Sequence, residues 1–175
     1  MALDRFFIDV IRALTRPILK WTEQARQHDK EVFEQLETIF PEDELRQFLN
    51  LLEANHSYFV NSRTPMLRFV EAATTIKLSF LSSDFNRDLA NYVMALKELS
   101  AFLAKHFYTE GPGQGSADLV GYMEPHLNQD RAEDIPSDEQ MSRYDKYGVQ
   151  LAEMTAGVWD SYRHYRKAIQ EDIFV

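Results

Sequence analysis

The side chains best placed for chemistry in this sequence are a carboxylate and an imidazole one helical turn apart. Glu53 and His56 stand at positions i and i+3 of the stretch EANH, the spacing at which carboxylate-bridged di-iron centres in helix bundles hold their ligands. Such a centre needs a second Glu-x-x-His, and the sequence offers Asp160 and His164 at i and i+4 instead. We therefore expect His56 to be a core histidine with a hydrogen-bond partner, and a metal ligand is the alternative.

Patterns that identify common catalytic sites are missing. The sequence has no P-loop, GxGxxG, GxSxG or HExxH pattern, and the Gly-rich stretch GPGQGS lacks the Lys and the Ser or Thr that hold a phosphate in a P-loop. Because the chain has no cysteine, a disulfide framework, a thiolate metal site and a cysteine nucleophile are excluded. We expect a protein that is not an enzyme and that uses no cofactor.

A second candidate surface combines aromatic and cationic side chains in the stretch VWDSYRHYRKAI, residues 158–169. These side chains could line a groove for a nucleic-acid backbone, or they could be the buried side and the solvated side of one packed helix. The second interpretation is favoured because apolar positions recur at spacings of three and four along this region, which is typical of a helix that stays against a neighbour. This apolar stripe consists of Met141, Tyr144, Gly148, Leu151, Thr155, Val158, Tyr162, Tyr165 and Ile169.

The cations and Trp159 fall beside or opposite the apolar stripe, where a solvated helix face belongs. We take the following residues as the candidate interaction surface: Arg143, Lys146, Trp159, Arg163, Arg166 and Lys167. Small residues at four-residue spacing, Gly148, Ala152 and Ala156, form a second feature of the same helix. They would let another helix approach closely, and that helix could belong to this chain or to a second copy of it.

The elements that must position these residues are predicted to be helices nearly everywhere. An apolar pattern of helical period begins at Leu3 and is interrupted at Pro17. Later helices are signalled by Pro41 with three acids beside it, by Thr64 before Pro65, by Ser83 or Asp84, and by Ser137 with Gln140 as a capping box. No segment alternates at period two for long enough to predict a strand, and His28, His106 and His126 are expected at the surface or at helix ends.

The predicted architecture is all-α: a single-domain antiparallel helix bundle of five to seven helices over residues 1–175, ending in a long helix. Residues 1–108 are expected to form the main bundle. Residues 109–136 are expected to be an acidic connector that opens with the Gly-rich stretch TEGPGQGS and contains a short helix over residues 118–128. Residues 137–171 are expected to form the long helix, packed back on the bundle or on a second copy.

Charge and hydropathy limit the classes of partner. The formal net charge is −9, and eight acids against one arginine from Glu110 to Glu139 place −7 of it in this stretch, which includes most of the connector. Such a charge disfavours general attraction to nucleic acid or anionic lipid. No run of about 18 uncharged apolar residues is present, so we expect no membrane insertion, and no targeting segment is evident. We expect a cytoplasmic protein.

Three functions follow from these observations. The leading hypothesis is a helical protein–protein interaction module, such as an adaptor, an assembly factor or an inhibitor or immunity-type partner, with homo-oligomerisation through the last helix as a possibility. One alternative is a nucleic-acid-associated subunit that uses the basic and aromatic face of the last helix, including Tyr147, Trp159 and Tyr162. The other is a bundle that binds a metal or an apolar ligand near His56.

Overall fold

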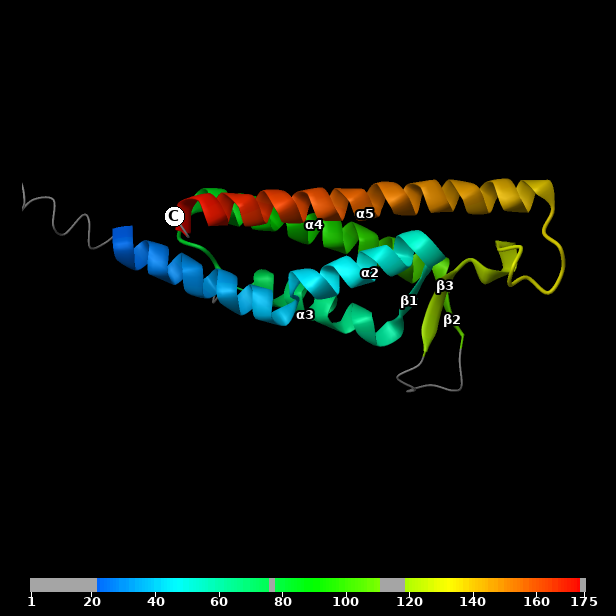
Figure 1. Ribbon diagram of the computed structural model, residues 1–175, viewed down its shortest axis with the longest axis horizontal. Helices are drawn as coiled ribbons and strands as arrows, with labels where there is room; N and C mark the ends of the chain where they lie inside the picture. The colour runs from blue at the N-terminus through cyan, green and yellow to red at the C-terminus, as the bar shows by residue number, and fades with distance from the viewer. Residues whose placement is uncertain (1–21, 76–77, 111–118, 174–175) are drawn as a thin grey trace, which may run out of the picture.

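The computed structural model describes residues 22–75, 78–110 and 119–173. The predicted helix that begins at Leu3, its interruption at Pro17 and most of the Gly-rich stretch lie outside the described residues. The described part is mostly helical and ends in a long helix, as the sequence predicts (Figure 1). Its helices are residues 22–39, α2 (Glu42–Asn55), α3 (Arg63–Ala73), α4 (Ser83–His106) and α5 (Asp138–Ile173). No helix among the described residues is long and apolar enough to cross a membrane.

The helices begin close to the predicted signals because these signals satisfy N–H groups locally. The capping box is present: the Gln140 N–H donates to Ser137 Oγ at 3.3 Å and the Ser137 N–H donates to Gln140 Oε1 at 2.8 Å. Pro41 precedes α2, whose first turn is acidic. Two predicted caps were displaced by one or two residues, because Ser82 caps α4 and α3 begins at Arg63 after a 3-10 turn.

A small antiparallel sheet accompanies the helices, and the sequence did not predict its strands. It contains β1 (Ser57–Phe59), β2 (Phe107–Glu110) and β3 (Val120–Met123) in the order β1-β3-β2. Strands of three or four residues are too short for alternation to be visible, and β1 finds its partner more than 60 residues further along the sequence. The short helix expected over residues 118–128 is wrong for the same reason: β3 takes its first half, and one 3-10 turn, Pro125–Leu127, follows.

A buried pair joins this sheet to the helices. His106 ends α4 and its Nδ1 lies 2.7 Å from Glu124 Oε1, and both side chains are buried. The imidazole lies between the rings of Phe102 and Tyr147, with centroid distances of 4.7 and 4.3 Å. His106 is therefore a core residue and not the surface or capping residue that its position near a helix end predicted.

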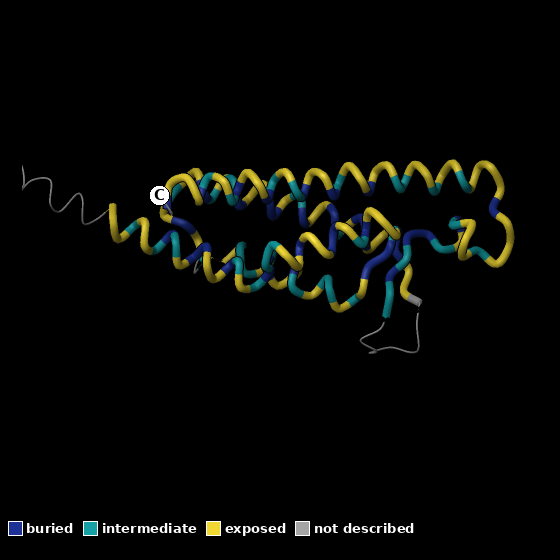
Figure 2. Tube along the Cα trace, in the orientation of Figure 1, coloured by how far each residue is buried: buried dark blue, intermediate teal, exposed yellow. Residues whose placement is uncertain are grey.

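The core lies on the side of α5 that faces the other helices. In Figure 1, α5 runs antiparallel to α4 for most of its length, and its first turns extend beyond the sheet. Figure 2 shows the opposite side of α5 as mostly exposed. The apolar stripe is fully buried only from Leu151 onward, whereas Met141, Tyr144 and Gly148 are half-buried because fewer elements cover that end.

Candidate functional site

Glu53 and His56, the weak metal candidates, bond to different residues of α5. His56 is the first residue after α2 and has a left-handed backbone with φ of 46°, so the i and i+3 geometry of a continuous helix is lost. Its Nδ1 lies 2.9 Å from the hydroxyl of Tyr144. Glu53 Oε1 instead accepts a hydrogen bond from the hydroxyl of Thr155 at 2.7 Å. Among the described residues, no three His, Asp or Glu side chains come together as a metal site.

The Tyr144 hydroxyl links His56 to Asn128. It accepts a hydrogen bond from Asn128 Nδ2 at 3.0 Å and lies 2.9 Å from His56 Nδ1. Burial lowers the pKa of His56, and the nearby charge of Asp145 opposes this effect. Burial also raises the pKa of Tyr144. His56 is thus a half-buried, hydrogen-bonded residue with a lowered pKa at the junction of α2 and α5.

The predicted strip of small residues is divided between a closed part and an open part. A Cβ on Gly148 would lie 3.2 Å from His56 Cε1, so the imidazole already occupies the space beside this glycine. Ala152 and Ala156 are exposed. At Gly148, therefore, this chain itself fills the space that the strip of small residues leaves, through His56. At Ala152 and Ala156 the strip stays exposed.

The predicted cationic surface is also divided. Arg143 and Lys146 are exposed near the start of α5, about 25–30 Å along the helix from Arg163. Arg163 forms an ion pair with Asp160, and Lys167 Nζ lies 3.6 Å from Glu171 Oε1. These residues therefore do not form one continuous basic surface.

Arg166 lies in a closed polar cluster rather than on an open face. Its guanidinium pairs with Glu42, lies 4.0 Å from Glu37 Oε2 and donates to the Tyr162 hydroxyl at 2.7 Å. Burial raises the pKa of Glu37, although the charge of Arg166 and the hydrogen bond from Tyr162 lower it. Burial also raises the pKa of Tyr162. The cluster joins α5 to α2 and to the helix before it, so Arg166 is engaged inside the fold.

Trp159 lines an open groove between α2 and α5, with a volume of about 530 Å³. We call this the α2/α5 groove, and its lining residues are Arg46, Leu49, Asn50, Glu53, Ala156, Trp159, Asp160 and Arg163. The Arg46 guanidinium lies 5.5 Å from the centre of the Trp159 ring and also pairs with Glu42 at 2.5 Å. The charged groups of this groove thus have partners within the chain.

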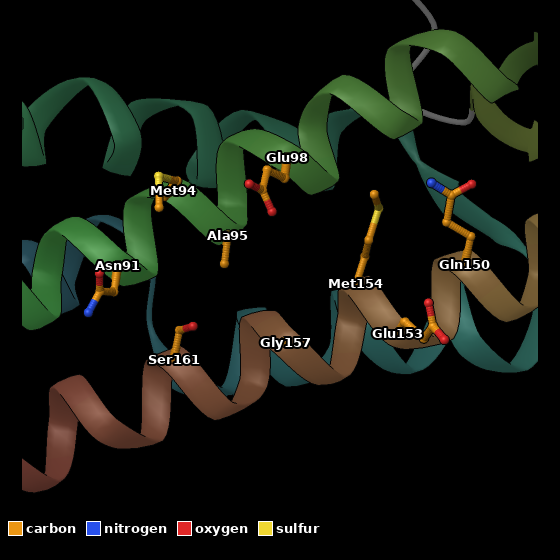
Figure 3. Close-up of a pocket in the computed structure, with 9 residues that line it drawn as sticks. All are labelled: Asn91, Met94, Ala95, Glu98, Gln150, Glu153, Met154, Gly157 and Ser161. Atoms are coloured by element: carbon orange, nitrogen blue, oxygen red, sulfur yellow. The ribbon is translucent and has the colours of Figure 1, made fainter.

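A second groove lies on the other flank of α5, against α4, and has a volume of about 470 Å³ (Figure 3). We call it the α4/α5 groove. Figure 3 shows Ala95 of α4 and Met154 of α5 pointing into the space between the two helices. Met94 is 59% exposed beside them. The lining is completed by Asn91, Glu98, Gln150, Glu153, Gly157 and Ser161.

The two carboxylates of the α4/α5 groove differ from the charges of the other groove. Glu98 lies on α4 and Glu153 on α5, and both are exposed. Within residues 22–75, 78–110 and 119–173, no lysine, arginine or histidine forms an ion pair with either of them. The groove therefore combines thioether and methyl groups with two carboxylates that have no cationic partner in the described chain.

Gly157 is the most informative residue of this groove. Apart from its two chain neighbours and the nearby backbone of α5 itself, no described atom lies within 4 Å of the position that a Cβ would take, so the fold leaves open space there. Glycine in a helix interior costs about 1 kcal/mol relative to alanine, and nothing in the described structure offsets that cost. The sequence analysis missed this groove. A glycine inside a long helix and off its apolar stripe was the signal that could have drawn attention to it.

Comparison with known proteins gives no match that bears on these observations. No protein-family model, no curated protein and no solved structure matches the chain. The interpretation of function therefore rests on the residues and contacts described above.

Proposed function

We propose that this protein is a non-enzymatic protein–protein interaction module, of the adaptor, assembly-factor or inhibitor kind, that binds its partner in the α4/α5 groove. The observation that carries the proposal is Gly157, which weakens α5 without serving any described contact. A glycine of this kind has a use when a partner must approach the helix backbone closely.

The chemistry of the groove supports a protein as the partner. Met94 and Met154 are flexible and polarisable, and methionines of this kind can adapt their shape to an incoming apolar side chain. An exposed apolar strip with a polar rim is the usual composition of a protein-binding surface. The helices α4 and α5 give the strip a rigid base.

Two observations favour the interaction module over the two alternative functions. A nucleic-acid groove requires a continuous row of available cations, yet Arg163, Arg166 and Lys167 are each paired with a carboxylate, and Arg143 and Lys146 lie near the other end of α5. A metal site near His56 requires Glu53 to face the same space, yet Glu53 is bonded to Thr155. We therefore propose neither of them.

A second copy of the chain is a poorer occupant than a different protein. In a two-fold dimer the same patch of both copies meets, so Glu98 and Glu153 would face their own equivalents. The net charge of −9 adds to that repulsion. We propose that the partner is a different chain.

The test is to fill the groove without disturbing the fold. Gly157→Leu places an isobutyl group in the open space, Gly157→Ala is the matched control, and Ala156→Leu fills the α2/α5 groove instead. A partner captured from the native source, identified and purified, should bind wild type, Gly157→Ala and Ala156→Leu but not Gly157→Leu. Unchanged binding to Gly157→Leu, or equal loss with Ala156→Leu, would contradict the proposed function.

A further inference from the structure

The α4/α5 groove has the shape of a site for a helix. It runs between two long antiparallel helices, and its lining on α5 extends from Gln150 to Ser161 (Figures 1 and 3). At 1.5 Å per residue this is about 17 Å, the length of roughly three helical turns. A third helix laid along this groove would contact α4 and α5 at once.

Close approach of such a helix is possible in the middle of the groove. The position of a Gly157 Cβ is open, and Ala95 on α4 carries only a methyl group. Packed helices come within 8–10 Å of each other when small side chains lie at the contact. Gly157 and Ala95 together provide such a contact, and Met94 and Met154 lie on either side of it (Figure 3).

The charges of the groove determine which helix fits. Glu98 and Glu153 belong to the two different helices that form its walls, and neither has a cationic partner among the described residues. A helix in the groove would carry its apolar side chains inward at i, i+3 or i+4 and i+7, and its flanks would meet the two glutamates. Lysine or arginine on those flanks would be attracted, whereas aspartate or glutamate would be repelled.

We infer that the occupant of the α4/α5 groove is a basic amphipathic helix of a partner protein, an inference that rests on the proposed function. Its apolar face packs on Met94, Met154 and Gly157, and its lysines or arginines pair with Glu98 and Glu153. The net charge of −9 also accelerates the encounter with a basic segment, because opposite charges steer association at low salt.

The probe for this inference is a synthetic amphipathic peptide of about 15 residues, long enough for the three turns above. One version has leucines at helical spacing with lysines on both flanks, and the second version replaces every lysine by glutamate. Each is titrated into the full chain by calorimetry. We expect the basic version to bind and to weaken as salt is raised, and the acidic version to bind at least about tenfold more weakly.

Charge reversal at the groove separates specific pairing from general attraction to an acidic protein. In Glu98→Lys with Glu153→Lys, binding of the basic peptide should weaken by about tenfold or more. The matched control, Glu71→Lys with Glu133→Lys, changes the net charge equally at two exposed residues outside the groove. In this control the affinity for the basic peptide should fall by no more than about threefold, because screening limits the effect of distant charges.

Four outcomes would overturn the inference: equal weakening by both double variants, no effect of Gly157→Leu on peptide binding, equal or tighter binding of the acidic peptide, or no binding of the basic one. Failure of the proposed function is distinguishable from these. If Gly157→Leu still abolishes binding of the native partner while the acidic peptide binds better than the basic one, the groove is the binding site and only the inferred basic charge of the partner helix is wrong. If Gly157→Leu leaves capture of the native partner unchanged, the groove is not the binding site and both fail.

Discussion

Gly148 and Gly157 lie on the same helix, yet their surroundings differ in a way that separates folding from function. The space beside Gly148 holds the imidazole of His56, at 3.2 Å from the position of an added Cβ, whereas the space beside Gly157 is open. The first glycine thus makes room for a contact within the chain. The second has no such contact, and our proposal is that it makes room for a partner instead.

The same contrast applies to the polar groups beside the two glycines. His56, Tyr144 and Asn128 form a chain of hydrogen bonds at the junction of α2 and α5. Glu98 and Glu153 beside the open glycine have no cationic partner in the described chain. The polar groups beside Gly148 are thus bonded to one another within the chain, whereas the two carboxylates beside Gly157 remain available for a partner under the proposed function.

The largest effect is expected where α5 is most closed. Tyr165 is fully buried and packs on the rings of Phe33, Phe80 and Tyr92. Tyr165→Ala should lower the free energy of unfolding by about 3–5 kcal/mol, measured by chemical denaturation. The control is Tyr165→Phe: the hydroxyl has no hydrogen-bond partner among the described residues, so its removal should be neutral or stabilising. If Tyr165→Ala were as stable as wild type, Tyr165 would not contribute to the core as its burial implies.

A smaller effect on stability is expected at Gly148, where the His56 imidazole fills the space beside the glycine. Gly148→Leu forces a side chain against the His56 imidazole and should lower the free energy of unfolding by about 1–3 kcal/mol, because overpacking displaces neighbours. The chemical shifts of His56 should also change as its hydrogen bond to Tyr144 is disturbed. Unchanged stability together with unchanged His56 shifts would show that this junction is not closed.

A pH dependence should accompany the closed junction. Because burial lowers the pKa of His56 below its usual 6.5, the unfolded chain binds the proton more tightly than the folded chain. The contribution of His56 is therefore present above about pH 6.5 and is lost as the pH falls through the lowered pKa. His56→Asn, which also tolerates a left-handed backbone, should remove this part of the pH profile. An identical profile in the variant would contradict the assignment.

The smallest effect is expected for an exposed cation of α5. Arg163 pairs only along its own helix, with Asp160, and both side chains are largely exposed. Arg163→Ala should change the free energy of unfolding by less than about 1 kcal/mol. Nucleic acid should bind wild type and variant equally weakly at physiological salt in a fluorescence titration. A steep loss of nucleic-acid affinity with Arg163→Ala would restore the alternative that we rejected.

The features that could be predicted from the sequence depend on residues that are close together in the chain. The bounds of α5 followed from a capping box and a periodic apolar stripe, both visible within one stretch of chain. The strands could not be predicted because they are short and their pairing joins residues that are not neighbours in the sequence, such as Phe107 and Met123 or Ser57 and Tyr122. Arg166 was expected at the surface because its partners, Glu37 and Glu42, lie more than a hundred residues away in the sequence. The α4/α5 groove exists only once two helices are placed side by side.

The measurement that tests the central claim most directly is the affinity of the basic peptide for Gly157→Leu relative to Gly157→Ala, with the unfolding free energy of both variants determined in parallel. Both substitutions replace a glycine in open space, so both variants should be as stable as wild type or more stable by up to about 1 kcal/mol. The account predicts that Gly157→Ala keeps most of the peptide binding and that Gly157→Leu loses it. A stable Gly157→Leu that binds the peptide as well as Gly157→Ala would contradict it.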